Sequence, residues 1–259
     1  MKNLLRTFWQ IVFREIVIFR KVIVSKIIDL LIMISANIIV FTYLMPSFGL
    51  KSNYGPFIVI GLIPAIALFE AIPRTSTLVM DMTGNKKISY LLTLPMPSFM
   101  SIGAIAMGWA SSSFLYTIFI LPIAKIFLFN KFDLSNFSFF KFLISFTSIQ
   151  IMLGFFSLFL ASMIKDMKYM SWIWARIVNP LFMLGGFFYS WHSINAISHI
   201  AGTINLFNPI MLSTEAIRAS VFGQSGYLPF WLSVLAIWVF ILIFSTFGIM
   251  KIKKRLDCV

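Results

Sequence analysis

The sequence predicts an all-α polytopic membrane protein with six transmembrane helices, and three observations lead to that prediction. Of the 259 residues, 60% are hydrophobic and only 11% are charged, whereas a soluble domain carries roughly 25% charged residues. The mean hydropathy is +0.95. Uncharged apolar stretches long enough for helices of about 20 residues recur along the chain. Because so few charges cannot cover a water-soluble surface, residues 1–259 are expected to form one membrane domain without a cytosolic catalytic domain.

The first predicted element is an amphipathic helix over residues 2–21. On a helical wheel its polar residues share an arc of about 120°. The apolar residues on the opposite side are Phe8, Ile11, Val12, Ile16 and Phe19. This pattern is typical of a helix that lies in the membrane interface. Glu15 falls on the apolar side, where it forms either a local ion pair with a neighbouring Arg or Lys or a specific contact with another protein.

Six apolar stretches follow, and each predicts a transmembrane helix. They cover residues 27–46, 56–79, 98–124, 142–164, 169–190 and 229–250. Glu70 and Arg74 are four residues apart near the end of the second span, so they are expected to neutralise each other. Arg176 in the fifth span either extends to the membrane surface or faces the protein interior.

The distribution of basic residues predicts the orientation in the membrane. Of the 21 Lys and Arg residues, 16 fall on the side of the N-terminus and 5 on the opposite side. The positive-inside rule therefore places both termini in the cytoplasm, as expected for a multi-pass protein of the inner (cytoplasmic) membrane. The net charge of +13 fits contact with the anionic head groups of a lipid bilayer rather than with nucleic acid. A single cysteine, Cys258, excludes an intrachain disulfide.

The loop after the second span contains a short amphipathic stretch between helix breakers. Gly84 and Asn85 end the preceding helix, residues 86–92 could form a short helix, and Pro95 and Pro97 stop it. The segment is either an ordinary basic turn or a short helix that docks on a cytoplasmic partner.

Residues 191–228 are predicted to form an outer helical hairpin. Asn208 is a candidate N-cap, and Pro209 occupies the first helical position. The helix should run to Phe222 and end at Gly223. Glu215 and Arg218 are three residues apart on one face of it, close enough to pair. The hairpin either re-enters the membrane or folds as a loop over the outer mouth.

Residue patterns that support catalysis are missing from the sequence. His192 and His199 are the only histidines, and no carboxylate stands near them in the sequence. No phosphate-binding P-loop is present, and the pair Gly103 and Gly108 favours close helix packing instead. We therefore expect no cofactor, no metal and no enzyme activity in this chain. If transport is driven by a nucleotide, another chain binds it.

The order of these parts resembles the permease subunit of type-2 ABC exporters, a family that exports polysaccharides, lipo-oligosaccharides and drugs. The segments that carry the resemblance are Pro56–Pro64, Leu91–Pro97, Gly185–Ser193 and Leu206–Arg218 with Gly223. The Asn-Pro…Glu-x-x-Arg…Gly pattern in the last segment is the most specific. The chain departs from the family at Asn195, where a proline is common, and it lacks a Leu-Gly-x-Leu-Trp run at the first span. The first span is more like the lipo-oligosaccharide and drug branch.

The resemblance implies a homodimer of this chain with two copies of a separate ATPase, moving a glycolipid, a polysaccharide or a hydrophobic compound. The residues expected to couple to the ATPase are Gly84, Asn85, Lys86, Lys87, Ile88 and Leu91. The residues 165–168 form the alternative coupling loop. Two other classes remain open. A membrane-embedded lipid-modifying enzyme would need clustered His, Arg and Asp, and an ion-coupled transporter would be favoured by inverted repeats.

Overall fold

The computed structural model of the chain describes residues 2–49, 54–85 and 87–257, and every regular element in them is a helix. Five helical segments are long and apolar enough to cross a membrane. They are Asn3–Phe48, Tyr54–Gly84, Ser98–Leu128, Phe139–Met163 and Phe230–Leu256. The chain is thus consistent with a multi-pass membrane protein, as the sequence predicts, although a sixth helix of this length is not found in the described part of the chain.

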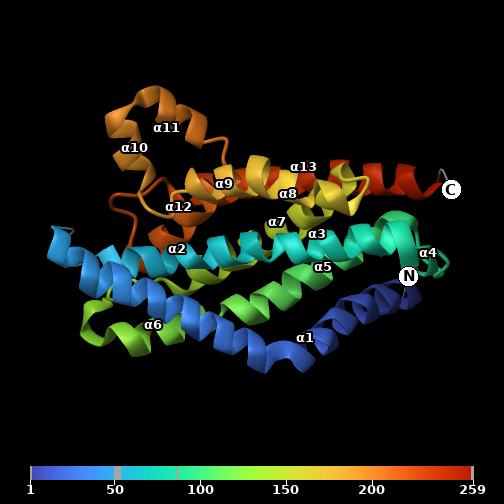
Figure 1. Cartoon of the computed structure of the whole chain (residues 1–259), viewed down its shortest axis with the longest axis horizontal. Helices are drawn as coiled ribbons and strands as arrows, with labels where there is room; N and C mark the ends of the chain where they lie inside the picture. Colours follow the sequence, from blue (N-terminus) through green and yellow to red (C-terminus); the bar gives the residue numbers. More distant parts are fainter. Residues whose placement is uncertain (1, 50–53, 86, 258–259) are drawn as a thin grey trace.

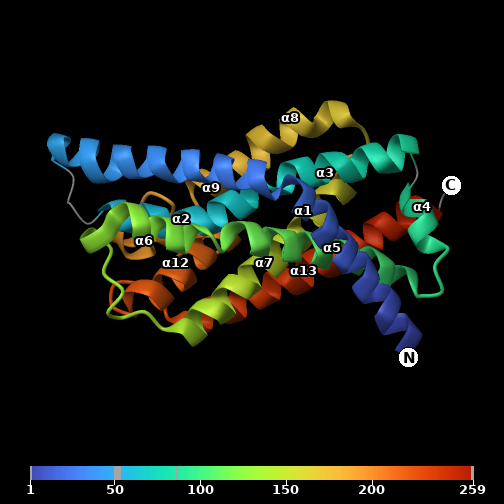
Figure 2. The same cartoon turned by 90° about the horizontal axis from the view of Figure 1, so that it is seen from below.

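The N-terminal helix and the first predicted span form one helix instead of two. Helix α1 runs from Lys2 to Ile38 and continues through the π-helical turns Ile39–Leu44 and the 3₁₀ turn Met45–Phe48. It contains neither Pro nor Gly, but it bends part-way along (Figures 1 and 2). Ile11 and Val12 are buried, and α1 packs against α5 (Ser98–Thr117). The apolar side of residues 2–21 is therefore partly buried against α5 and partly exposed on the surface of the molecule.

The second span is divided at Glu70 into α2 (Tyr54–Phe69) and α3 (Ala71–Met80). Pro73 lacks an N–H, so it cannot donate to the carbonyl of Phe69 four residues earlier. That missing bond accounts for the turn at this position. Helix α3 continues into the π-helical turn Asp81–Asn85, and the short helix α4 covers Lys87–Leu92. The α4 range agrees with the short helix that the breakers predict.

Helix α7 (Phe139–Met163) is the centre of the bundle. It packs against α3, α5, α12 (Pro209–Phe222) and α13 (Phe230–Asp257). A Cβ atom placed on Gly154 would lie 2.5 Å from the carbonyl oxygen of Ala106 in α5. The glycine thus permits two helix backbones to come close together. Buried polar contacts also join the helices, such as Gln150 Nε2 to Thr117 Oγ1 at 3.0 Å.

The segment predicted as the fifth span, 169–190, is a short and irregular helix. It consists of the 3₁₀ turn Met167–Tyr169, α8 (Met170–Ile173), the π-helical turn Trp174–Val178 and α9 (Asn179–Met183). Turns follow, and Gly186 has a φ of +72°. At 1.5 Å per residue, residues 170–183 span about 21 Å, less than the roughly 30 Å of a bilayer core. Arg176 is exposed and lies 5.3 Å from the ring centroid of Trp172.

Residues 191–222 form three helices. The short helices α10 (Trp191–Ile197) and α11 (His199–Asn205) pack together and protrude from the bundle (Figure 1). Helix α12 begins at Pro209 after the N-cap Asn208 and ends at Phe222 before Gly223, whose φ is +92°. Both ends agree with the sequence prediction. The side chains of α12 are buried around almost its whole circumference.

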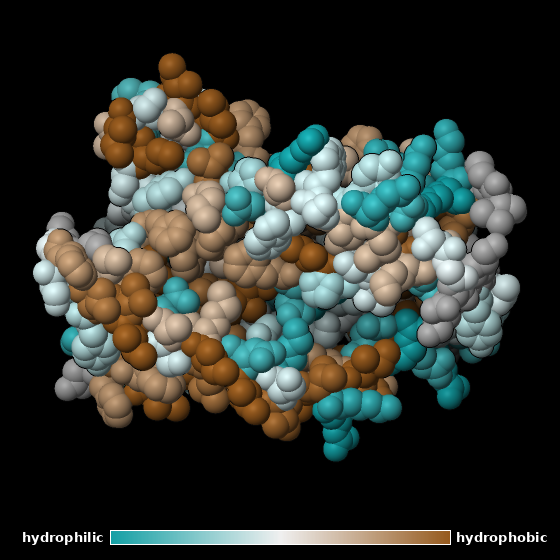
Figure 3. Space-filling view, in the orientation of Figure 1, coloured by the Kyte–Doolittle hydropathy of each residue, from teal (hydrophilic) through white to brown (hydrophobic). Residues whose placement is uncertain are grey.

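The two ends of the molecule differ in composition. Both chain termini and α4 lie at one end, here called the terminal end, while α10 and α11 lie at the opposite hairpin end (Figures 1 and 2). Hydrophilic side chains gather at the terminal end, and hydrophobic ones cover much of the rest of the face seen in Figure 3. Arg255 in α13 donates hydrogen bonds to the carbonyl oxygens of Ile164 and Lys165. The last turns of α13 are therefore fastened to the loop after α7.

Candidate functional site

Helix α4 is fixed to the end of the bundle by a cap and by two apolar side chains. The Asp81 carboxylate accepts a hydrogen bond from the backbone N–H of Ile88, with Oδ2 and N 2.7 Å apart. It thereby satisfies one of the N–H groups that a helix start leaves free. Ile88 and Leu91 are 1% and 7% exposed, and α4 packs against α5. Gly84 lies in the preceding turn with open space beside it.

This arrangement changes the expected roles of two predicted coupling residues. Because Ile88 and Leu91 face the chain's own core, they hold α4 in place and do not present a surface to a partner. Tyr90 is 68% exposed and takes the outward position instead. Lys86 lies outside the described residues, as do the side chains of Asn85 and Lys87.

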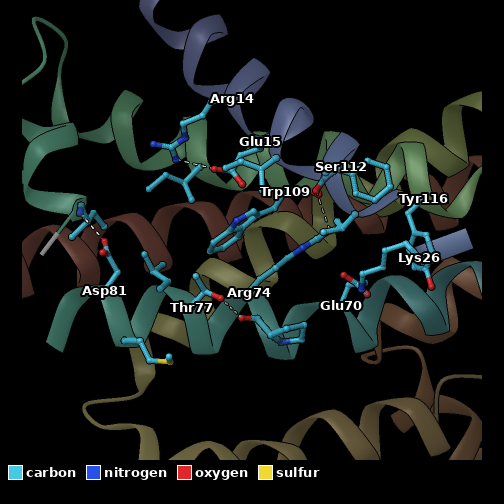
Figure 4. A pocket seen from close by; sticks show the side chains of 18 of the residues that line it. Arg14, Glu15, Lys26, Glu70, Arg74, Thr77, Asp81, Trp109, Ser112 and Tyr116 are labelled. Carbon is cyan, nitrogen blue, oxygen red and sulfur yellow. Dashed lines mark hydrogen bonds and ion pairs between the residues drawn. The ribbon is translucent and has the colours of Figure 1, made fainter. Parts of the chain in front are cut away.

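A cavity of about 890 Å³ lies next to α4, between α1, α3 and α5. Figure 4 shows Arg14, Glu15 and Lys26 from α1 approaching it, together with Arg74 and Asp81 from the α3 segment. The Arg14 guanidinium donates to Glu15 at 2.8 Å, which confirms the local ion pair. Glu15 also packs over Gly108 of α5, where an added Cβ would lie 2.6 Å from Glu15 Cγ.

The charges at the Glu70 turn pair differently from the sequence prediction. Glu70 binds the ammonium group of Lys26 in α1, not Arg74. Arg74 reaches across to α5, where Nη2 donates to Ser112 Oγ at 3.3 Å. The expected pairing of Glu70 with Arg74 was therefore wrong. The reason is that Lys26 on a neighbouring helix supplies a closer cation, which the spacing within one helix cannot reveal.

At the other end of the molecule, Arg218 of α12 is fully buried and binds backbone oxygens from two distant segments. Its Nη1 donates to the carbonyl of Gly186 at 2.5 Å, Nη2 to Phe187 at 2.9 Å and Nε to Phe57 at 3.2 Å. The guanidinium also lies 3.4 Å from the centroid of the Phe57 ring. Gly61 leaves room for it, since a Cβ there would lie 2.6 Å from Arg218 Nη2.

Glu215, also fully buried, binds two loop segments. Its carboxylate accepts hydrogen bonds from the backbone N–H of Trp191 and of Leu228, both at 2.9 Å. No ion pair joins Glu215 to Arg218 in the described structure, so the predicted pairing was wrong. Both side chains instead satisfy backbone groups of α2 and of the loops around α12. Gly61 and the Gly185–Gly186 pair are the sequence signals for this arrangement, because each makes room beside α12.

The described residues contain no group of three or more His, Cys, Asp or Glu side chains that could hold a metal. His199 contacts Asn195, with Nδ1 and Oδ1 3.3 Å apart. A comparison of the chain with models of known families and with curated proteins finds no match.

Proposed function

We propose that the chain is the transmembrane subunit of an ATP-driven exporter of the type-2 ABC class. Two copies of it would form a homodimer, and two copies of a separate ATPase would dock at the terminal end. Helix α4 carries the proposal. Motion of an ATPase can move a membrane helix only through a rigid connection, and Asp81, Ile88 and Leu91 fasten α4 to the bundle.

The arrangement of the two ends supports this proposal. The termini, α4 and the basic last turns of α13 gather together, as required if all of them face the cytoplasm. In this proposal the first part of α1 lies at the membrane interface, residues 169–190 complete a sixth crossing, and residues 191–228 form a re-entrant hairpin. The cargo would be a glycolipid, a polysaccharide or a hydrophobic compound, moved across the inner membrane.

Site-specific cross-linking tests the docking surface. With Cys258→Ser as background, Tyr90→Cys carrying a photoreactive label should cross-link to the ATPase that co-purifies with this chain. Tyr43→Cys is the matched control, because Tyr43 is also exposed but belongs to the helical turns that end the first span at the opposite end of the molecule. Cross-linking from residues 165–168 but not from Tyr90 would assign docking to that loop instead.

ATP hydrolysis provides the second measurement. The purified chain alone should not hydrolyse ATP, and the complex with the ATPase should. Hydrolysis by the rigorously purified chain would contradict the proposal. An ion-coupled transporter would need no ATPase, so export that continues after deletion of the ATPase would favour that class.

A further inference from the structure

The cavity beside α4 contains a half-buried cation, Arg74, whose hydrogen-bonding capacity is only partly used. Arg74 extends from α3 across the cavity toward α5 (Figure 4), where Ser112 accepts from Nη2. Its Nη1 is buried and has no hydrogen-bond partner within the described parts of the chain. Such groups are rare in folded proteins, because an unsatisfied buried donor costs free energy.

The carboxylates around the cavity are engaged with other groups. Glu15 binds Arg14, Glu70 binds Lys26, and Asp81 accepts from the N–H of Ile88. Within the described chain, no ion pair involves Arg74. A guanidinium in this condition is suited to bind a phosphate, which accepts hydrogen bonds from two of its nitrogens at once.

The rest of the cavity suits a hydrocarbon chain. Apolar side chains from three helices line it: Ile18, Phe19, Val22, Leu78 and Ile105. Its volume of about 890 Å³ is near the upper end of ligand-binding cavities and far exceeds that of one phosphate ion. Figure 3 shows hydrophilic side chains in a recess between α1 and the α2–α3 segment, so a ligand can enter from the side.

We propose that this cavity binds an anionic phospholipid, whose phosphate accepts hydrogen bonds from Arg74 and whose acyl chain lies along the apolar wall. The site does not depend on the export function, because a bilayer supplies such a lipid to a membrane protein of any activity.

Native mass spectrometry of the full chain in detergent, together with its thermal unfolding, tests the site with three probes. Palmitoyl-oleoyl phosphatidylglycerol should bind and raise the unfolding temperature. Diacylglycerol with the same chains lacks the phosphate, and inorganic phosphate lacks the chains, so both should bind at least about 10-fold more weakly. Equal binding of diacylglycerol would overturn the role of Arg74. Equal protection by inorganic phosphate would show a free-anion site and overturn the lipid assignment.

Two pairs of variants locate the site. Arg74→Gln should raise the dissociation constant for phosphatidylglycerol about 10- to 100-fold, as expected for loss of charge-assisted hydrogen bonds. Arg176→Gln, an exposed arginine outside the cavity, should leave it unchanged. Val22→Trp should block the apolar wall, whereas Val24→Trp, also exposed but not part of the lining, should not.

The lipid-free protein distinguishes a ligand site from a structural arginine. Arg74→Gln should unfold at the same temperature as the unmodified chain without lipid, and differ only when lipid is added. If Arg74→Gln binds phosphatidylglycerol as well as the unmodified chain does, the proposal is wrong. The proposal is also wrong if the variant is less stable without lipid to the same extent as with it.

Discussion

At the scale of single residues, Arg218 and Glu215 show how buried charges can organise loops without pairing. Each forms charge-assisted hydrogen bonds with backbone groups, which are about twice as strong as neutral ones. Arg218 donates to the carbonyls of Phe57, Gly186 and Phe187. The two side chains therefore define the shape of the hairpin end.

The first prediction concerns Arg218. Arg218→Gln should lower the free energy of unfolding by about 3 kcal/mol or more, because it removes several buried charge-assisted hydrogen bonds. Arg218→Lys should recover only part of the loss, since an ammonium group lacks the planar fork that reaches several carbonyls. Thermal unfolding in detergent measures both. Arg176→Gln is the control, and a surface change of that kind stays within about 0.5 kcal/mol. Equal effects at the two positions would refute this account.

Some residue roles can be predicted from the neighbouring sequence, and others cannot. The Asn208 cap, Pro209 and Gly223 act within a few residues of one helix end, so the sequence predicts both ends of α12. The partners of Arg218 and Glu215 come from elsewhere in the chain, and Lys26 and Glu70 are 44 residues apart. Pairings across such separations depend on helix packing, so spacing along one helix led to the wrong partners.

At the scale of helices, length and hydropathy were sufficient for the regular spans but not for residues 169–190. The predicted and observed ranges of the other five spans overlap, although the second is interrupted at Glu70. The segment 169–190 contains Arg176 and Asn179, and a π-helical turn at Trp174–Val178 and the turns at Gly185 and Gly186 shorten it. Such turns arise from packing and glycine conformation, which periodicity does not reveal.

The second prediction compares two helix glycines. Gly154→Ala should reduce the free energy of unfolding by about 1–3 kcal/mol, because its Cβ would overlap the Ala106 carbonyl and push α5 and α7 apart. Gly103→Ala should be neutral or stabilise by up to about 1 kcal/mol, since the nearest atom would be 3.9 Å away. Equilibrium unfolding in mixed detergent measures both. Similar losses at both positions would contradict the close approach of α5 and α7.

At the scale of the whole molecule, the gathering of both termini and α4 at one end agrees with the arrangement that counting Lys and Arg predicts. Counting the Lys and Arg residues in each loop predicts which loops and termini lie on the same side of the membrane. This count needs only the positions of the loops in the sequence. It could not reveal the cavity between α1, α3 and α5. Pro73 marks the break at Glu70 beside this cavity, but α1 bends without a Pro or Gly, and no local pattern shows that the three helices leave a space between them.

The third prediction concerns membrane orientation. In a Cys258→Ser background, cysteines at Asn136 and Ser225 should react with a membrane-impermeant reagent added to intact cells lacking an outer-membrane barrier. Cysteines at Thr93 and Lys168 should react only after the membrane is opened. All four positions are exposed, so accessibility within the protein does not explain a difference. Reaction of Thr93 in intact cells would reverse the orientation or exclude the predicted topology.

The bonds of Arg218 also impose an order on biogenesis. The arginine donates to Phe57, a residue 161 positions earlier in the chain, and to the loop that precedes α10. These acceptors are synthesised first, and they can bind Arg218 only after α12 has left the ribosome. The charged side chains of Glu215 and Arg218 in α12 form their hydrogen bonds only inside the assembled bundle. Helix α12 therefore packs into the bundle after the earlier helices have inserted. The hairpin end is thus completed late in synthesis, and a nascent chain that stops before α12 leaves its inserted helices without their closing element.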